Sequence, residues 1–236
     1  MKKGLLRNHF KEQEATIKNS PLDLILELEK LLASDPIALS ILGDLREQVV
    51  PSKQRLAKQQ VVEKRGFELP EEFVQEKNAS FVLFSDGACK ENPGGVGAWA
   101  FVGQNRQGEV FLEKSGVANN TTNNRMELTG VIRALEHLYQ YLEENSQAAA
   151  KSKEVIFLFT DSRYVVDGFS KWMAGWKRRG WKKPDNREPE NLELWQRLDR
   201  LHHEVFSKLK ILWVRGHVGH PQNEYCDQLC TERLKA

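Results

Sequence analysis

Hydrophobic positions in the first part of the chain are spaced as they are in helices. Apolar residues, mostly leucine, recur every three or four positions over 22–32, after Ser20 at a capping position. A second helical segment has Ser34 or Asp35 as its cap and ends before Pro51. Helices this short are marginally stable alone, so we expect these two to be covered by the main domain, a partner or a second copy.

From about residue 81 the spacing predicts strands as well as helices. The apolar run 81–84 and the glycine-containing stretches 91–104 and 109–118 predict three antiparallel strands joined by short connections. Downstream, the predicted strands cover 154–160 and 210–215, and the predicted helices begin at Thr121 or Thr122, Ser162, Asn191 and Pro221. The resulting order, β-β-β-α-β-α-α-β-α, predicts an α/β domain in which helices cover a mixed sheet.

Length and composition narrow the class of protein. The 236 residues, 40% of them hydrophobic, supply one good core with room for a small appendage. No apolar run approaches the ~20 residues that a membrane span needs, and the first twenty residues lack the pattern of a secretory signal. The three cysteines, Cys89, Cys226 and Cys230, do not have the spacing of a zinc site. We therefore expect a reduced, soluble, cytoplasmic protein.

Charge is distributed unevenly although the formal net charge is only +2. Residues 1–76 carry 12 basic and 13 acidic side chains, whereas 77–236 carry 23 and 20. Within 171–183 there are six Lys or Arg and no acid, interleaved with Trp172, Trp176 and Trp181. Cations that alternate with tryptophans are typical of a nucleic-acid-binding surface, although a solvated face over core tryptophans would give the same pattern.

Four acidic residues form a candidate metal site. Asp86 and Asp161 each follow a buried strand in the same pattern of three apolar residues, Ser or Thr, and Asp. Adjacent strands would place both carboxylates on one rim of the sheet, where ligands bind in α/β folds. Glu127 lies in the first turns of the central helix and Asp227 in the last helix. Clustered carboxylates repel one another and raise each other's pKa. A bound Mg²⁺ or Mn²⁺ offsets this repulsion and can activate a water molecule that attacks a phosphodiester.

Taken singly, each of these acids would more often be a turn, cap or helix-dipole residue. The motifs around these acids instead favour a shared role in a metal site. They are SDGACKENPGG from Ser85, TTNNRMEL from Thr121, TDSRYV from Thr160 and GHVGHP from Gly216, with GWKRRGWK and LWQRLD before the last. With these motifs in order over about 80–236, the chain resembles bacterial-type ribonuclease HI. The resemblance implies the ribonuclease H fold, a five-stranded mixed sheet in the order 3-2-1-4-5 flanked by helices.

The same resemblance implies an activity and its catalytic groups. The activity is endonucleolytic cleavage of the RNA strand of an RNA/DNA hybrid by two Mg²⁺ ions, with Mn²⁺ as a possible substitute, leaving 5′-phosphate and 3′-hydroxyl ends. The implied metal-binding catalytic carboxylates are Asp86, Glu127, Asp161 and Asp227. His217 would assist proton transfer or product release, for which a pKa near neutrality is suited. A histidine between two glycines would otherwise be read as a surface residue. Asn223 would orient this loop or a substrate phosphate.

Recognition of a hybrid requires a protein to distinguish RNA from DNA, and the 2′-hydroxyl is the group that differs. Asn92, Asn124 and the backbone near Cys89 resemble the family's contacts to the RNA strand. Thr122 and Asn123 resemble part of its pocket for a DNA phosphate. The same residues are also common in turns and helix caps, and the two roles are compatible.

The basic, tryptophan-containing stretch resembles the basic protrusion of the family. Cations there would follow the phosphates, and indoles would pack against sugars or bases. The implied contacts are Trp172, Trp176, Lys177, Arg178, Arg179, Lys182 and Lys183. We predict that Trp195 and Trp213 instead lie in the core.

These assignments divide the chain into a helical extension, 1–75, and a catalytic domain, 76–236. The extension has few aromatic residues and a balanced charge, unlike the basic hybrid-binding module of some family members. We therefore expect it to bind a protein partner or a second copy of the chain. Two alternatives keep the fold: a binding module with a vestigial site, and an integrase-like or resolvase-like enzyme. The intact acids and His217 disfavour the first, and TTNNRMEL with the protrusion disfavours the second.

Overall fold

The computed structural model describes residues 66–145, 154–216 and 219–235, together with Leu28, Leu31 and Leu42. The chain divides into two compact units, Met1–Val62 and Glu63–Ala236. In the first unit the three described leucines are helical, as their spacing predicts. The remainder of the two predicted helices, and the predicted protein-binding role of that segment, lie outside the described residues.

The second unit is built on a five-stranded sheet in the order β3-β2-β1-β4-β5, as the resemblance implied. Its strands are β1 (Phe81–Cys89), β2 (Gly97–Asn105), β3 (Val110–Ala118), β4 (Ile156–Thr160) and β5 (Leu209–Trp213). The first three strands pair antiparallel, whereas β4 runs parallel to both β1 and β5. The sheet is therefore mixed, and its parallel half brings the carboxyl ends of β1, β4 and β5 to one edge.

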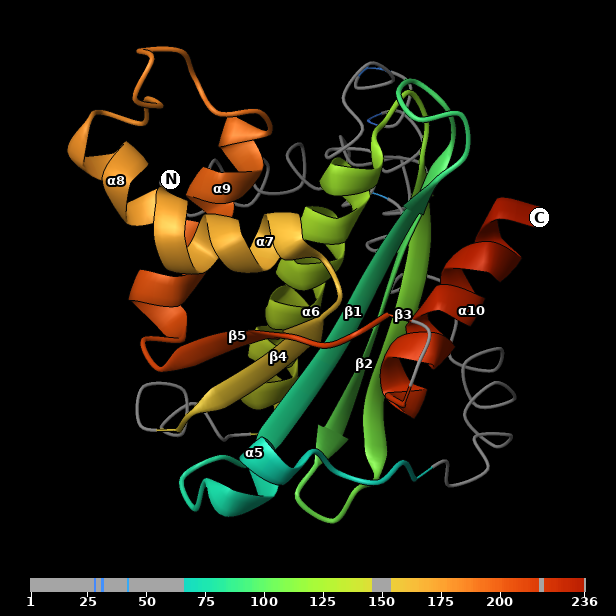
Figure 1. Ribbon diagram of the computed structural model, residues 1–236. Helices are drawn as coiled ribbons and strands as arrows, with labels where there is room; N and C mark the ends of the chain where they lie inside the picture. The colour runs from blue at the N-terminus through green and yellow to red at the C-terminus, as the bar shows by residue number, and fades with distance from the viewer. Residues whose placement is uncertain are drawn as a thin grey trace, which may run out of the picture. The chain divides into compact units, whose positions relative to one another are not determined.

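Helices cover both faces of the sheet. The long helix α6 (Asn123–Glu144) lies behind it in Figure 1, and α10 (Pro221–Lys235) lies on the opposite face. The other elements are α5 (Glu71–Gln75), α7 (Arg163–Asp167), the π-helical turn η2 (Gly168–Trp172), α8 (Met173–Arg178), α9 (Leu192–Arg200) and the π-helical turn η3 (Leu201–Val205). Within the described part of the chain, none of the helices has the length and apolar character needed to cross a membrane.

Alternation along the strands explains the two buried layers. In β1, Val82 and Phe84 belong to an apolar cluster that includes Cys226 and Cys230 of α10. The intervening Leu83 is also fully buried, and by the two-residue period of a strand it points to the face that α6 covers. Because β1 is central and covered on both faces, its sequence is a continuous apolar run, as in other buried strands.

The segment 66–80 packs on the sheet as part of the catalytic unit. Phe73 of α5 is fully buried, and its ring meets the edge of Phe157 at 6.0 Å between centroids. The guanidinium of Arg106, after β2, donates hydrogen bonds to the carbonyls of residues 73, 74, 76 and 79 at 2.9–3.1 Å. The compact unit therefore begins before the predicted boundary at 75/76, because Phe73, which the prediction placed in the extension, belongs to its core and Leu69 packs against that core.

Candidate active site

Three carboxylates meet at the carboxyl edge of the parallel strands. Phe84 of β1 is paired with Phe159 of β4, so Asp86 and Asp161, each two residues further on, lie at the same level of neighbouring strands. Glu127 reaches the same place from the second turn of α6. Each of the three acids offers an oxygen, and these oxygens all lie within 4.8 Å of one another. The pairing of β1 with β4 therefore places the carboxylates of Asp86 and Asp161 at one edge of the sheet, as the repeated sequence pattern predicted.

Glycine makes the close approach of α6 to β1 possible. A Cβ atom at Gly87 would lie 2.2 Å from the backbone nitrogen of Glu127, which no real side chain tolerates. The backbone N–H of Gly87 donates to Asp86 Oδ1 at 2.8 Å, which orients that carboxylate. The Asp-Gly pair therefore serves both the packing of the helix and the geometry of the site.

Burial and mutual repulsion make the ionised state of this cluster costly. Asp86 is 6% exposed, and burial together with the charge of Asp161 raises its pKa to about 8. The pKa of Glu127, 7% exposed, is also raised well above its usual range by burial and by Asp86 and Asp161. Asn123 donates to Glu127 Oε1 at 3.2 Å and opposes this shift. The site therefore favours a compensating positive charge.

The donor set fits a hard divalent cation. All three ligands are carboxylates, and Glu127 Oε2 is buried with no hydrogen-bond partner in the described part of the chain. A buried acceptor without a partner is costly unless a cation or ordered water satisfies it. Oxygen-only ligands are those that Mg²⁺ and Mn²⁺ prefer.

The remaining predicted catalytic residues lie around this cluster. Asp227 is on α10, outside the group of three acids whose oxygens converge, and its charge contributes to the raised pKa of Asp86. His217 lies outside the described residues. Asn223, in the first turn of α10, is buried, and its N–H donates to the carbonyl of His220 at 2.9 Å. The side-chain Oδ1 of Asn223 has no hydrogen-bond partner among the residues that the structure describes.

Predicted nucleic-acid contacts gather at the N-terminus of α6. Thr122 caps this helix, its hydroxyl accepting a hydrogen bond from the N–H of Arg125 at 3.2 Å. The N–H of Asn123 donates to Asn92 Oδ1 at 3.2 Å, which joins the loop after β1 to the helix. Asn124 is exposed. The positive end of a helix macrodipole attracts anions, so this place suits a phosphate.

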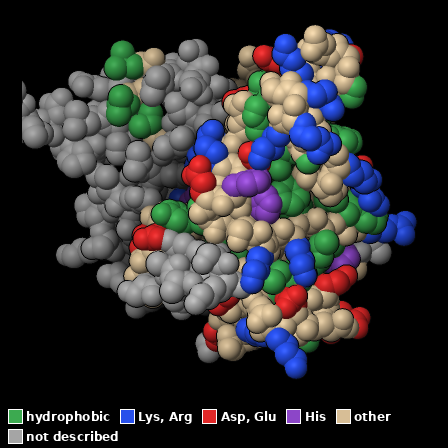
Figure 2. Space-filling model, turned by 90° about the vertical axis from the view of Figure 1, so that its left-hand side faces the viewer, with side chains coloured by type: hydrophobic (Ala, Val, Ile, Leu, Met, Phe, Trp, Pro, Cys, Tyr) green, Lys and Arg blue, Asp and Glu red, His purple; other side chains and the backbone are tan. Residues whose placement is uncertain are grey.

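The protrusion comprises η2, α8 and the loop up to α9. Figure 2 shows Lys and Arg side chains gathered over the upper part and right-hand edge of this face. Within the protrusion, Arg178, Arg179 and Lys182 are exposed. Lys177 pairs with Asp199 at 2.7 Å and Lys183 lies 3.7 Å from Glu190, so these two predicted phosphate contacts are partly neutralised within the protein.

Two of the four tryptophans whose placement was predicted lie elsewhere than expected. Trp172 is 38% exposed, consistent with a surface role, but Trp176 is 7% exposed and packs against Trp195 at 5.6 Å between ring centroids. The burial of Trp176 contradicts its prediction as a hybrid contact, because η2 and α8 fold its indole against α9. Trp195 is fully buried as predicted. The prediction that Trp213 lies in the core is wrong, since it is 39% exposed at the end of edge strand β5.

Sequence reasoning missed a cation–π contact that joins α7 to the end of β5 next to Asp161. The guanidinium of Arg163 lies 3.6 Å from the centroid of the Trp213 ring, and the indole N–H of Trp213 donates to the carbonyl of Asp161 at 3.0 Å. In the sequence, Arg163 is part of the TDSRYV motif, and nothing in that motif indicates a contact with Trp213. Its stacking depends on a tryptophan fifty residues away, which no local pattern reveals.

Fold and site together are those of an α/β domain with a candidate metal site of three carboxylates. The family model described as RNase H matches residues 78–235, and the chain belongs to this family. A protein named Ribonuclease H from Geotalea uraniireducens is 44% identical over 153 residues, which cover 65% of this chain and 92% of that protein. Another from Thiobacillus denitrificans is 46% identical over 154 residues, covering 64% and 90%. The domain is therefore an enzyme with ribonuclease H activity.

Solved structures show the same fold. LC11-RNase H1 in complex with an RNA/DNA hybrid has a TM-score of 0.51 and 21% identity, covering 66% of this chain and 96% of that one. LC9-RNase H1, described as a type 1 RNase H with the type 2 active-site motif, has a TM-score of 0.51 and 27% identity, covering 70% and 74%.

Proposed function

We propose that this protein is an endonuclease that hydrolyses the RNA strand of RNA/DNA hybrids by two-metal-ion catalysis, giving 5′-phosphate and 3′-hydroxyl ends. The observation that carries the proposal is the carboxylate cluster of Asp86, Glu127 and Asp161, which is buried, mutually repelling and partly without hydrogen-bond partners. The hybrid bound to LC11-RNase H1, a protein of the same fold, supports the class of substrate.

The proposed mechanism assigns a role to each group. Asp86, Glu127 and Asp161 would hold Mg²⁺, or Mn²⁺ in its place, and Asp227 would complete the ligand set from α10. Bound metal would activate the attacking water and stabilise the leaving oxygen of the phosphodiester. His217 would move a proton or promote release of the product. Asn223 would orient the loop that precedes α10 or a substrate phosphate.

The substrate contacts complete the proposal. Asn92 and Asn124 would face the RNA strand, where the 2′-hydroxyl distinguishes it from DNA. Thr122 and Asn123 would bind a phosphate of the DNA strand at the N-terminus of α6. On the protrusion, Trp172 and the exposed cations would follow the backbone of the hybrid.

A panel of end-labelled duplexes tests this function directly. With Mg²⁺ we expect cleavage of the RNA strand of an RNA/DNA hybrid, and at least about a hundredfold slower cleavage of RNA/RNA and DNA/DNA duplexes of the same sequence. Each interaction with a 2′-hydroxyl is worth of the order of a hydrogen bond, and several act together. The products should carry 5′-phosphates. Binding of the hybrid without cleavage would instead identify a non-catalytic hybrid-binding module.

The exposed cations of the protrusion should govern the salt dependence of binding. Replacing Arg178, Arg179 and Lys182 with alanine should weaken hybrid binding and reduce the slope of log affinity against log salt by about 0.9 for each phosphate that the protein no longer neutralises. The turnover at saturating hybrid should change much less, since none of the three lies among the carboxylates. Binding titrations at several salt concentrations measure the slope.

A matched control for this variant is Lys171→Ala, because Lys171 is exposed on η2 but paired with Asp167 at 2.8 Å. Its effect on the slope should be smaller than that of one exposed arginine. An unchanged slope in the triple variant would show that the protrusion is not part of the hybrid-binding surface.

A further inference from the structure

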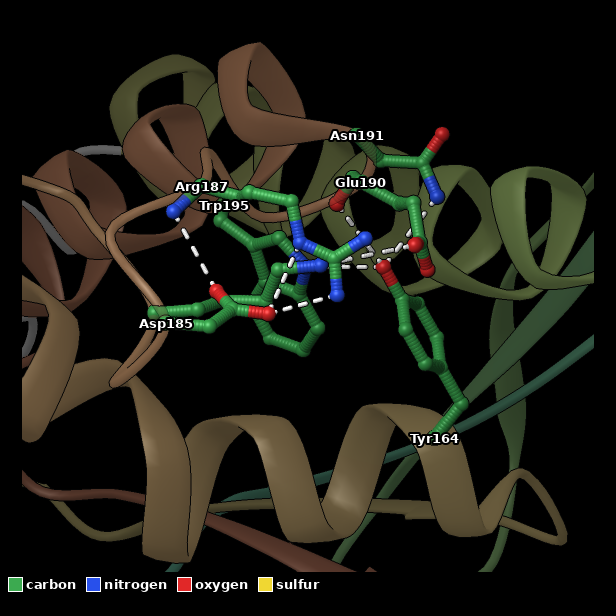
Figure 3. A network of polar contacts seen from close by, with 7 residues as sticks. Tyr164, Asp185, Arg187, Glu190, Asn191 and Trp195 are labelled. Carbon is green, nitrogen blue, oxygen red and sulfur yellow. Dashed lines mark hydrogen bonds and ion pairs between the residues drawn. The ribbon is translucent and has the colours of Figure 1, made fainter.

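A saturated hydrogen-bond network surrounds Tyr164, the third residue after Asp161. The Tyr164 hydroxyl accepts from Trp195 Nε1 at 2.9 Å and from Asn191 Nδ2 at 3.1 Å, and it donates to the carbonyl of Glu190 at 3.0 Å (Figure 3). A tyrosine hydroxyl has one proton to donate and two lone pairs, so every position is occupied. The network fixes α7, which follows Asp161, to the start of α9.

The side-chain amide of Asn191 extends this network to the helix that carries Glu127. Arg125, two residues before Glu127 on α6, donates to Asn191 Oδ1 at 3.2 Å and also pairs with Glu193 at 2.6 Å. Asn191 is thus bonded through its nitrogen to the Asp161 segment and through its oxygen to the Glu127 segment. These two segments belong to separate elements, α7 and α6, with strand β4 between them in the chain.

Asn191 holds this position at a conformational cost. Its backbone is left-handed, with φ 57° and ψ 38°, a region that residues other than glycine occupy rarely. The first turn of α9 begins on its carbonyl, which accepts hydrogen bonds from the N–H groups of Leu194 and Trp195 at 3.0 and 3.1 Å. Such a conformation persists where the surrounding contacts determine it, and here those contacts converge on the amide.

The same loop leads into the protrusion. Glu190, whose carbonyl binds Tyr164, has its carboxylate 3.7 Å from Lys183 Nζ. The N–H of Lys183 donates to the carbonyl of Arg187 at 2.8 Å, and Asp185 binds the guanidinium of Arg187. On the other side, the ring of Trp172 meets the edge of Tyr164 at 6.2 Å between centroids. One end of the protrusion therefore packs on Tyr164 through Trp172, and the other end is bonded to Tyr164 through the carbonyl of Glu190, the residue before Asn191.

We propose that Tyr164 and Asn191 are positioning residues that hold the protrusion in a fixed register to the carboxylate cluster, and so determine which phosphodiester of a bound hybrid is cleaved. The inference rests on the proposed function and deepens it. The protrusion fixes where the hybrid backbone lies, while the carboxylates fix where the chemistry occurs. A shift of about 1 Å between binding and reacting groups can reduce a rate by about a hundredfold.

The decisive variant is Asn191→Gly. Glycine adopts the left-handed backbone without cost, so this change removes the bridging amide while retaining the turn. Binding of the hybrid should stay within about twofold, because no cation of the protrusion is removed. The turnover should fall by about three- to tenfold, since more of the bound hybrid would be out of register. On a hybrid of defined sequence, cleavage should spread from the main position to neighbouring phosphodiesters.

Asn186→Gly is the matched control. Asn186 lies in the same loop, also has a positive φ of 67°, and is exposed. It should retain the wild-type cleavage positions and turnover. Tyr164→Phe, which removes only the hydroxyl, should reproduce the effect of Asn191→Gly, and the double variant should be no worse than the more affected single variant, because both act through one network.

Separate results would overturn the inference and the proposed function. If Asn191→Gly keeps the wild-type cleavage positions and turnover, and differs only in thermal stability, the network is structural and the inference is wrong while the proposed function stands. If the wild-type protein does not cleave the hybrid, the proposed function fails and the inference fails with it. Should Tyr164→Phe not fold, Asn191→Gly and its control still decide the question.

Discussion

Replacing Asp86 with asparagine is expected to reduce the Mg²⁺-dependent cleavage of an RNA/DNA hybrid by at least about 10³-fold, equivalent to about 4 kcal/mol in the activation barrier. Asp86 is one of the three acids whose oxygens converge, and its strand β1 is paired with β4, which leads to Asp161. An amide has the same shape but no charge, so it weakens the hold on a divalent cation. Steady-state rates with labelled hybrid measure the loss, and Asp161→Asn should behave in the same way.

The same variant should be more stable than the wild-type protein when no metal is bound. Because the pKa of Asp86 is raised to about 8 in the folded state, from an ordinary value near 4, the folded protein binds this proton more tightly than the unfolded chain. The stabilising contribution of the proton is complete below about pH 4 and is lost as the pH rises through about 8. The stability of the metal-free wild-type protein should therefore fall over this interval, and that of Asp86→Asn should fall less.

Denaturant unfolding at several pH values, with and without Mg²⁺, checks this expectation. Mg²⁺ should stabilise the wild-type protein at about pH 8, and it should stabilise Asp86→Asn less. Asp167→Asn is a suitable control, since Asp167 pairs with Lys171 on the surface of α7 and lies away from the cluster. Near-normal turnover of Asp86→Asn would contradict the metal-binding assignment.

Replacing Phe73 with alanine is expected to destabilise the catalytic unit by about 3–5 kcal/mol. Phe73 is fully buried against Phe157, and it is the buried residue of the small helix α5. The cost combines the transfer free energy of the ring with the cavity that its removal leaves. Chemical denaturation compares the variant with the wild-type protein.

Val74→Ala is the matched control, because Val74 is the next residue on α5 and is 51% exposed, and it should change stability by no more than about 0.5 kcal/mol. A shortened protein that begins at Glu76 should lose stability like Phe73→Ala, whereas one that begins at Glu63 should not. The shorter of the two would also remove one of the two acceptors of the buried amide of Gln222, the carbonyl of Glu68, and leave only Gln104 Oε1. Equal stability of the two shortened proteins would refute the assignment of residues 66–75 to the core.

The pattern of residues along the chain predicted the elements of the catalytic unit and its acids. Apolar runs of strand length, helical spacing after Thr122 and the repeated Ser/Thr-Asp pattern are local properties, and the structure has the corresponding elements and acids. The prediction that Asp86 follows its strand is wrong, because β1 continues past it to Cys89. The order of the strands was predicted from the family resemblance, which depends on several motifs along the whole domain. These features could be predicted because short-range periodicity depends on residues that are close together in the chain, whereas the need for glycine at position 87 arises from the distant helix α6.

Only the tertiary structure decided which tryptophans are buried and which residues belong to the core. Trp176 and Trp213 both lie among mixed polar and apolar neighbours in sequence, yet one is covered by α9 and the other lies at the free edge of β5. Phe73 could not be assigned from its short helix, because its partner Phe157 belongs to a distant strand. The network of Tyr164, Asn191 and Arg125 joins three separate elements. Burial, pKa shifts and such bridges depend on which distant segments meet, and the free energy that selects them is a property of the whole packed domain.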